Sequence, residues 1–284
     1  MRRNSIPEGS EVLPPPGSST GQEPRLWMRG ITKSFRAVCA LNNVHFEVYA
    51  GEVVGLVGDN GAGKSTLMKT ISGAGPVDEG EIMVDGQPVK IISPQVATRL
   101  GIEMVYQDLA LCDNLDVVSN LFLGRELRTA YGTLNEMAME QQGLAVLRTL
   151  DVKIPSIRAI VSTLSGGQRQ SIAVAKTILR QAKIVLLDEP TAALGVAQTR
   201  QVLNLIRRLR GQNLAVVVIS HNLADVFEVA DRVIVLRLGR RAGTFDVKTT
   251  TTQQIVAAMT GAEFGEIMQS ETTDENRPQK GNES

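Results

Sequence analysis

A glycine-rich run that ends in a lysine and two hydroxyl residues is the first feature of the sequence that could do chemistry. The run reads Gly58-Asp59-Asn60-Gly61-Ala62-Gly63-Lys64-Ser65-Thr66 and joins a strand expected at residues 53–57 to a helix expected at residues 64–72. Glycines let backbone N–H groups curl around a phosphate, and the start of a helix adds partial positive charge. Lys64 would reach the β- and γ-phosphates, and Ser65 would offer its hydroxyl to Mg²⁺. The order of strand, loop and helix therefore predicts a site for a nucleoside triphosphate.

Two carboxylates follow a second apolar strand. The run Ile184-Val185-Leu186-Leu187 ends in Asp188 and Glu189. Because Mg²⁺ prefers oxygen ligands and keeps several waters, Asp188 is predicted to hold the ion through a water. Glu189 would lie beside the γ-phosphate and orient or deprotonate the attacking water. The pair could also merely begin the turn into Pro190, but the presence of Lys64 and Ser65 in the same sequence favours a catalytic role.

A second glycine-rich stretch precedes another expected helix, residues 168–180. It reads Ser165-Gly166-Gly167-Gln168, and a serine followed by glycines at a helix start is again suited to an anion. One chain has little use for two such cradles around one phosphate, whereas two chains arranged head to tail would use both. The sequence therefore favours a site that two copies of the chain share.

With Leu164 included, this stretch reads Leu-Ser-Gly-Gly-Gln, which is the signature motif of the ABC ATPase family. Signature, phosphate loop and acidic strand occur in the family's order, and the chain resembles the family from about residue 26 to residue 261. The resemblance implies ATP and Mg²⁺ as ligands and a homodimer of the ATPase subunit. Each ATP would lie between Lys64 and Ser65 of one copy and residues 165–168 of the other.

The same resemblance suggests roles for further single positions. Gln107, after a strand expected at residues 102–106, matches the glutamine that senses Mg²⁺ and the γ-phosphate, and His221 matches the histidine that contacts the γ-phosphate. Phe35 resembles the aromatic residue that stacks on adenine, with a core phenylalanine as a nearly equal alternative. Gly195 departs from the family pattern, since many members carry an aspartate in this interface loop. The resulting assignments are catalysis by Glu189, His221 and Gln107, and magnesium binding by Ser65, Gln107 and Asp188.

The elements that must position these residues alternate between strand and helix. Strands at residues 26–31 and 44–49, with a hairpin that turns at Asp85-Gly86, indicate a small antiparallel layer. The later strands are continuous apolar runs, which are typical of a sheet covered on both faces. The expected hairpin strands are residues 81–84 and 87–91, the later strands residues 184–187, 214–219 and 233–236, and the later helices residues 197–210 and 252–259.

From about residue 117 to residue 160 the strand pattern gives way to helical periodicity, and the helical subdomain is expected at about residues 108–165. One helix face there is predicted to carry Met137, Leu144, Leu147 and Leu150. The predicted fold is α/β: a P-loop NTPase core with a mainly parallel sheet, a small antiparallel β-subdomain and an inserted helical subdomain. The nucleotide-binding domain is expected at residues 25–264. Residues 1–24 and 265–284 are predicted to be disordered tails, because their polar and proline-rich composition offers little to pack.

Composition and charge limit the class of protein. The 284 residues include 30 Lys plus Arg and 30 Asp plus Glu, and this zero net charge does not support a nucleic-acid partner. Cys39 and Cys112 form no CxxC pair, so we expect them to be small apolar fillers in a reducing compartment. Because no apolar run approaches the roughly 18 residues that span a bilayer, work at a membrane would need a partner. We expect a peripheral position on the cytoplasmic face of the cell membrane.

Two kinds of work are compatible with an ABC ATPase. The segments at residues 105–115, 120–126 and 189–196 resemble bacterial importers of ribose-, xylose- and fructose-like monosaccharides, in a form with one cassette. This resemblance implies integral membrane permease subunits and, indirectly, a periplasmic or extracellular sugar-binding protein. The alternatives are the motor of a non-sugar ABC transporter, or a soluble ABC ATPase that acts on nucleic acid or the ribosome. The chain has neither the long coiled coil nor the second cassette typical of the soluble members.

Overall fold

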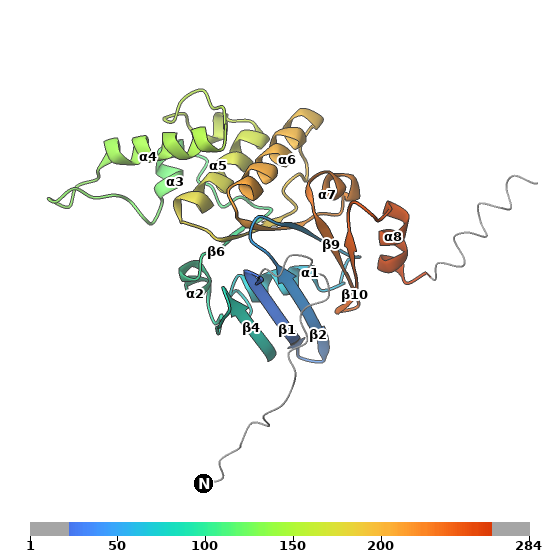
Figure 1. Ribbon diagram of the computed structural model, residues 1–284. Coiled ribbons are helices and arrows are strands. Elements are labelled where there is room, and N and C mark those ends of the chain that lie inside the picture. The colour runs from blue at the N-terminus through green and yellow to red at the C-terminus, as the bar shows by residue number, and fades with distance from the viewer. Residues whose placement is uncertain (1–22, 263–284) are drawn as a thin grey trace, which may run out of the picture.

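A six-stranded sheet with the order β10-β9-β3-β8-β7-β6 forms the centre of the computed structural model, which describes residues 23–262 (Figure 1). All of its neighbouring strands pair in parallel except β9 and β10, which form an antiparallel hairpin at one edge. The predicted mainly parallel sheet is therefore confirmed. Its strands are β3 (Val53–Val57), β6 (Ile102–Val105), β7 (Ile184–Asp188), β8 (Ala215–Ile219), β9 (Arg232–Arg237) and β10 (Arg240–Asp246).

A second, antiparallel sheet with the order β2-β1-β4-β5 lies below the first in Figure 1. The turn between β4 and β5 is Asp85-Gly86, and both residues have positive φ angles, 49° and 72°, as a tight two-residue hairpin turn requires. The predicted hairpin is confirmed, although β5 ends at Pro88 and not at Ile91. The strands of this sheet are β1 (Leu26–Phe35), β2 (Val38–Val48), β4 (Glu79–Val84) and β5 (Gln87–Pro88).

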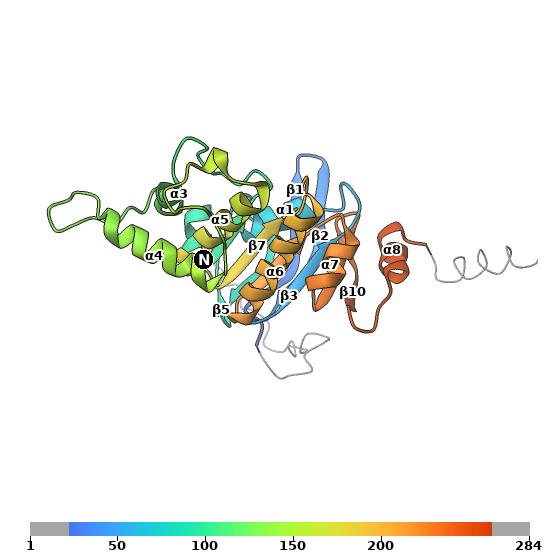
Figure 2. The same ribbon diagram turned by 90° about the horizontal axis from the view of Figure 1, so that it is seen from above.

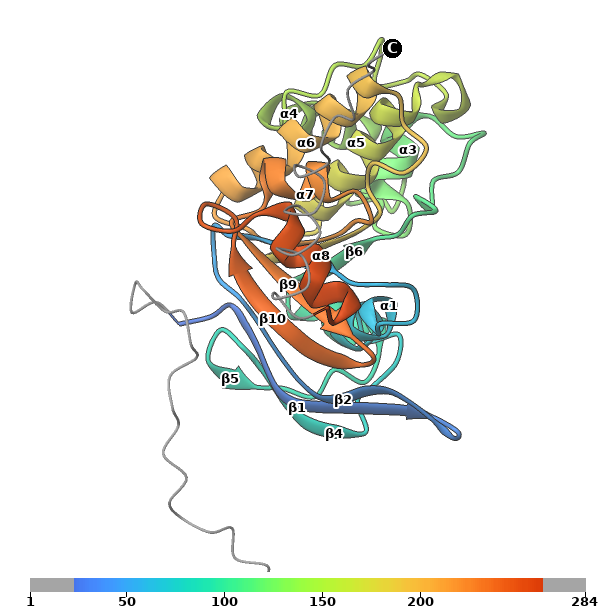
Figure 3. The same cartoon turned by 90° about the vertical axis from the view of Figure 1, so that its right-hand side faces the viewer.

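Helices cover the central sheet on the side opposite the antiparallel sheet. Figure 2 shows α5, α6 and α7 across this face, while α3 and α4 pack on the outer side of α5. Helix α1 lies between the two sheets, and α8 packs on the β9–β10 hairpin (Figure 3). The helices are α1 (Lys64–Ile71), α2 (Pro94–Arg99), α3 (Val117–Phe122), α4 (Glu136–Thr149), α5 (Gly166–Leu179), α6 (Val196–Gly211), α7 (Leu223–Val229) and α8 (Thr252–Thr260).

The buried strands divide their side chains between two apolar cores. In β3, Val53 and Val57 join the core under α5 and α6, whereas Val54 and Leu56 join the core shared with α1 and the antiparallel sheet. This alternation is the period of two that any strand imposes. Because both faces are covered, the strand reads as a continuous apolar run, which is why its bounds were predictable from sequence.

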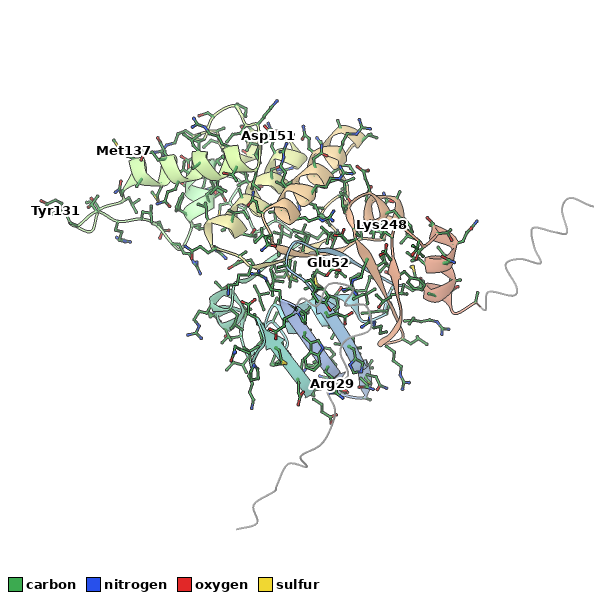
Figure 4. All side chains as sticks on the ribbon, in the orientation of Figure 1. Arg29, Glu52, Tyr131, Met137, Asp151 and Lys248 are labelled. Carbon is green, nitrogen blue, oxygen red and sulfur yellow. The ribbon has the colours of Figure 1, made fainter. Side chains whose placement is uncertain are left out.

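The predicted apolar face of α4 is wrong at two of its four positions. Met137 is 72% exposed and Leu144 is 36% exposed. Figure 4 shows Met137 at the outer end of α4, near the protruding segment that carries Tyr131. A methyl group at Gly143 would lie only 2.9 Å from Ile157, so the helix approaches its neighbours through a glycine. Hydrophobic periodicity registers only apolar side chains, so it does not reveal a close contact made at a glycine. The inner side of this region buries Met139, Gly143, Leu147 and Leu150.

Three elements and one cysteine also differ from expectation. The strand β10 and the short helices α2 and α7 were not predicted, because their runs are short and lack a clear apolar period. Cys39 is exposed and donates to the backbone oxygen of Leu41 at 3.2 Å, so its predicted role as an apolar filler is wrong. Cys112 is partly buried.

The described residues begin and end close to the predicted domain bounds. The segments expected to be disordered, residues 1–24 and 265–284, lie outside the described residues apart from Glu23 and Pro24. Within residues 23–262 no helix is both long enough and apolar enough to cross a membrane.

Candidate nucleotide site

The phosphate loop runs from the end of β3 to the start of α1, as predicted. Gly63 precedes α1 with φ 103°, and no side chain caps the helix there. A methyl group at Gly58 would lie 2.2 Å from the backbone oxygen of Leu236, so this position excludes every residue larger than glycine. Nothing lies within 4 Å of the corresponding position at Gly61. The loop thus packs closely on β9 at its start and is open at its middle, where its backbone can approach a ligand.

Lys64 folds back across this loop. Its Nζ donates to the backbone oxygens of Gly58 at 2.6 Å and of Asp59 at 3.0 Å. Partial burial lowers the pKa of Lys64, while the neighbouring charges of Glu189, Asp59 and Asp188 act in the opposite direction. The ammonium group therefore lies at the centre of the loop and within electrostatic reach of the acidic strand end. Ser65 is exposed in the first turn of α1, and Thr66 follows it.

The two carboxylates stand where β7 ends. Asp188 pairs with Ile219 of β8, so it lies at the carboxyl edge of the parallel sheet. Burial raises the pKa of Asp188, and the charge of Glu189 raises it further, while Lys64 lowers it. A partly buried carboxylate beside a second one, within electrostatic reach of Lys64, is an oxygen donor set that suits a hard divalent cation. The oxygen donors of Asp188 and Ser65 are therefore compatible with binding of Mg²⁺.

Glu189 and His221 form a close pair across two strand ends. Nδ1 of His221 lies 2.7 Å from Oε2 of Glu189, and the backbone N–H of His221 donates to the same oxygen at 3.4 Å. Glu189 has φ 48°, a left-handed conformation that is costly for this residue type. Its own N–H donates to the backbone oxygen of Ile219 at 3.0 Å, which holds that conformation. The imidazole is 76% exposed, whereas the side chain of Glu189 is 17% exposed, so the histidine lies on the solvent side of the pair.

Gln107 and Glu189 line the same groove. Gln107 follows β6 and is exposed, and the groove that it lines also includes Glu189, Pro190 and, from the start of α5, Gly166 and Arg169. The structure thus brings the predicted glutamine to the same edge of the sheet as the predicted carboxylate.

Phe35 ends β1 and pairs with Val38 of β2. Its side chain is 50% exposed, so the alternative of a core phenylalanine is wrong. The ammonium group of Lys33 lies 5.5 Å from the ring centre. From Val38 the strand β2 leads to Ala40, whose backbone oxygen would lie 2.8 Å from a methyl group at Gly63. The aromatic ring and the phosphate loop are therefore joined by one short stretch of β2.

The signature segment begins α5 and satisfies its own polar groups. The side chain of Ser165 accepts from the N–H of Gln168 at 3.3 Å, and Oε1 of Gln168 accepts from the N–H of Ser165 at 3.0 Å. Nε2 of Gln168 donates to the backbone oxygen of Lys153 at 3.0 Å. Ser165 and Gln168 thus bond to each other, and Gln168 also bonds to Lys153. Lys64, in contrast, bonds within the phosphate loop to which it belongs.

The two signature glycines also serve packing, a role that the sequence did not reveal. A methyl group at Gly166 would lie 2.8 Å from Leu194, and one at Gly167 would lie 3.0 Å from Gln201. The start of α5 therefore rests on the loop after Glu189 and on α6. Gly195 itself has φ −73° and open space around it, so its backbone does not demand glycine.

Sequence reasoning missed one contact near the acidic pair. Thr191 donates from Oγ1 to Oδ2 of Asp225 at 2.7 Å, and Thr191 is buried. This bond ties the loop after Glu189 to α7, a helix that was not predicted. The only signal in the sequence is Asn222, which caps α7 by accepting from the N–H of Ala224.

Comparisons with known proteins agree with this fold. A protein-family profile described as "ABC transporter" matches residues 41–192. The fructose import ATP-binding protein FrcA of Rhizobium meliloti is 48% identical, over 85% of this chain and 95% of that protein. The xylose/arabinose import ATP-binding protein XylG of Sulfolobus acidocaldarius is 44% identical, over 85% of this chain and 96% of that protein. This chain therefore belongs to the ABC transporter family, and it is an ATPase of that family's ATP-binding cassette class.

Other similar proteins define the extent of the likeness. The ribose import ATP-binding protein RbsA 1 of Burkholderia cenocepacia is 42% identical over 87% of this chain, which covers 48% of that protein. This chain thus spans about half of that longer relative. The solved ADP conformation of an ATP-binding cassette of an ABC transporter superposes with a TM-score of 0.73 at 22% identity, covering 87% of this chain and 99% of the cassette. At that identity the superposition supports the fold alone.

Proposed function

We propose that this chain hydrolyses ATP to power the import of a monosaccharide through a membrane permease. The observation that carries the proposal is the meeting of Lys64, Asp188 and the Glu189–His221 pair at one edge of the parallel sheet. The transport part is supported by the names of the relatives, which are import ATP-binding proteins for fructose, for xylose or arabinose, and for ribose.

Binding would use the whole phosphate loop. The N–H groups of Gly58, Asp59, Asn60, Gly61, Ala62, Gly63, Lys64, Ser65 and Thr66 would surround the phosphates, and Lys64 would exchange its bonds with the loop oxygens for bonds with phosphate oxygens. The exposed ring of Phe35 would stack on the adenine. Bound Mg²⁺ would neutralise charge on the β- and γ-phosphate oxygens, and Ser65, Gln107 and Asp188 are the residues that would hold it.

Hydrolysis would depend on Glu189 and His221. A carboxylate beside the γ-phosphate can orient a water and accept its proton as the water oxygen bonds to the γ-phosphorus and the bond from that phosphorus to the leaving ADP oxygen breaks. His221, 2.7 Å from Oε2 of Glu189, would fix the direction of that carboxylate and contact the γ-phosphate itself. Gln107, on the same groove, would respond to the presence of the γ-phosphate.

The complete site would need two copies of the chain. Ser165, Gly166, Gly167 and Gln168 lie at a helix start, where partial positive charge favours an anion, yet the lysine beside the acidic pair belongs to the other helix start. In a head-to-tail homodimer each ATP would be held by the phosphate loop of one copy and residues 165–168 of the other. Loss of the γ-phosphate would remove contacts from both copies, and the dimer would loosen.

The partners would be integral membrane permease subunits, with a sugar-binding protein acting on the far side of the membrane. The chain would then lie peripherally on the cytoplasmic face of the membrane. Residues 25–264 would form its nucleotide-binding domain. This arrangement is supported by the likeness to import ATP-binding proteins.

The proposal is tested by purifying the tagged full-length chain from its native membranes in mild detergent and identifying what accompanies it by mass spectrometry. The expected result is a polytopic permease, with ATP hydrolysis that increases when a sugar-loaded binding protein is added to the reconstituted complex. The Lys64→Ala variant is the matched control, because it should retain the permease and lose the hydrolysis. Recovery of only nucleic-acid or ribosomal partners would contradict transport.

A further inference from the structure

Two hairpins in this chain share one kind of turn but differ in its first residue. The β4–β5 turn is Asp85-Gly86 with φ angles of 49° and 72°, and the β9–β10 turn is Leu238-Gly239 with φ angles of 48° and 73°. Aspartate and asparagine suit the first position, because they tolerate the left-handed conformation. Asp85 also pairs with Lys183 at 2.6 Å. A leucine has no such compensation and is strained there.

Leu238 is unfavourable in a second way, because its side chain is 77% exposed. An exposed leucine alone is ordinary. In the described residues of the single chain, neither the exposure of this leucine nor its strained backbone conformation contributes a stabilising contact. Strain of this kind is found at functional sites, where a ligand or partner uses it.

The turn that carries Leu238 is attached to the phosphate loop. The N–H of Gly239 donates to the backbone oxygen of Ala62 at 3.1 Å, and its own oxygen accepts from the N–H of Asn42 at 2.8 Å. A methyl group at Gly63 would lie 3.5 Å from the Cα of Gly239. Figure 3 shows this end of the β9–β10 hairpin beside α1. Leu238 therefore stands at the rim of the loop, next to β2.

Two more exposed apolar side chains lie along the same rim. Val38 is 65% exposed and pairs with Phe35, which is 50% exposed. The strand β2 leads from Val38 to Ala40, and the oxygen of Ala40 would lie 2.8 Å from a methyl group at Gly239. A base that extends from phosphates in the loop toward Phe35 must pass over this stretch of β2, with Leu238 on its flank.

We propose that Leu238 is a nucleotide-binding residue that contacts the nucleoside part of the ATP. The inference rests on the proposed function, since it requires a nucleotide in the loop. The contact is apolar and makes no hydrogen bond to the base edge, so it tightens adenosine and guanosine nucleotides alike. The left-handed conformation of the turn leaves the side chain exposed at the rim and not packed against the protein.

The test is the Leu238→Asn variant of the full-length chain, because the substitution has opposite effects on folding and on binding. Asparagine relieves the turn, so the melting temperature of the ligand-free chain rises. The loss of apolar contact weakens ATP, ADP and GTP about fivefold in an equilibrium titration. Binding of inorganic tripolyphosphate, which has no nucleoside, stays unchanged. Leu238→Met retains the parent affinity for ATP, and Leu134→Asn, at an exposed leucine between α3 and α4, changes none of these values.

Three results would overturn the inference. One is an unchanged affinity of Leu238→Asn for ATP, and another is an equal loss of affinity for ATP and for tripolyphosphate. The third is parent-like ATP affinity combined with weaker ATP-dependent dimerisation, which would assign Leu238 to an interface between copies. If the parent chain bound no ATP at all, the proposed function would fail, and this inference would fail with it. If the parent chain binds ATP and one of the three results is found, only this inference fails, so the two failures are distinguishable.

Discussion

Helices α1 and α5 both begin after glycines, yet their first turns are built in opposite ways. Helix α1 starts after Gly63 at φ 103° with no side-chain cap, so its first N–H groups are left for something outside the helix. Helix α5 starts after Ser165, and Ser165 and Gln168 bond to each other's backbone. The first start leaves its N–H groups for a ligand by itself, whereas in the second the N–H groups of Ser165 and Gln168 are already bonded within the chain.

This difference predicts that one chain binds a nucleotide and does not complete the reaction alone. An uncapped start with Lys64 beside it gains strong charge-assisted bonds when phosphates arrive. A capped start gains only if its own bonds are replaced or supplemented, so it contributes a weaker contact. We expect the α1 start to determine affinity in a single chain and the α5 start to act when a second copy closes the site.

Removing the lysine of the α1 start should have the largest effect on binding. In Lys64→Ala the charge-assisted bonds to phosphate are lost, and the affinity for ATP should fall about 100-fold. An equilibrium titration measures the change, and Lys248→Ala, at an exposed lysine after β10 (Figure 4), is the control with parent-like affinity. Tight binding by Lys64→Ala would break the comparison, because α1 would then not be the start that holds the phosphates.

Removing the cap of the α5 start should affect hydrolysis and leave binding alone. Ser165→Ala removes one bond to the N–H of Gln168, which should lower the free energy of unfolding by about 1 kcal/mol. The rate of ATP hydrolysis should fall at least about tenfold, since a bond to phosphate from the second copy is lost as well. The affinity of a dilute, monomeric chain for ATP should stay within about twofold of the parent. A large loss of monomer affinity would mean that α5 acts within its own chain.

The pH dependence of stability tests the environment of Asp188, the carboxylate at the end of β7 that lies within electrostatic reach of Lys64. Since burial and Glu189 raise the pKa of Asp188, the ionised form is disfavoured in the folded chain. Stability linked to this group is present at low pH and is lost as pH rises through the raised pKa. Asp188→Asn should therefore melt at a higher temperature than the ligand-free parent at pH 7, with no difference near pH 3, below the ordinary Asp pKa of about 3.9.

The same variant should lose the magnesium dependence of ATP binding, because its amide is a poorer ligand than a carboxylate. Glu103→Gln offers no useful control, since Glu103 is paired with Arg180. Asp246→Asn, at an exposed aspartate of β10, is the matched variant and should keep the parent's magnesium dependence. A lower melting temperature for Asp188→Asn at pH 7 would contradict the account of this site.

Much of the site could be read from the sequence because its chemistry is local. The phosphate loop, the strand end at Asp188 and the helix start after Ser165 depend on residues close together in the chain, and residue type there determines conformation directly. Strands such as β3 were predictable because burial on both faces leaves a continuous apolar run. The fold class followed from the same runs.

The remainder depends on contacts between distant segments. Gly143 lies on the buried side of α4 because Ile157 approaches it, and Gly166 meets Leu194 for a similar reason. The bond from Thr191 to Asp225 spans 34 positions. No local pattern contains these partners, so sequence reasoning placed Leu144 on the wrong face and assigned the signature glycines to anion binding alone.

The central claim is that each ATP is held by the α1 start of one copy and the α5 start of another, and the most direct test uses Glu189→Gln. This variant keeps the shape of the site but lacks the group that accepts the proton. Sedimentation with ATP and Mg²⁺ should show a stable dimer with hydrolysis at least about 100-fold slower than the parent, and addition of Ser165→Ala to the variant should weaken that dimer. A chain that stays monomeric with bound ATP, or that hydrolyses ATP at the parent rate, would contradict the account.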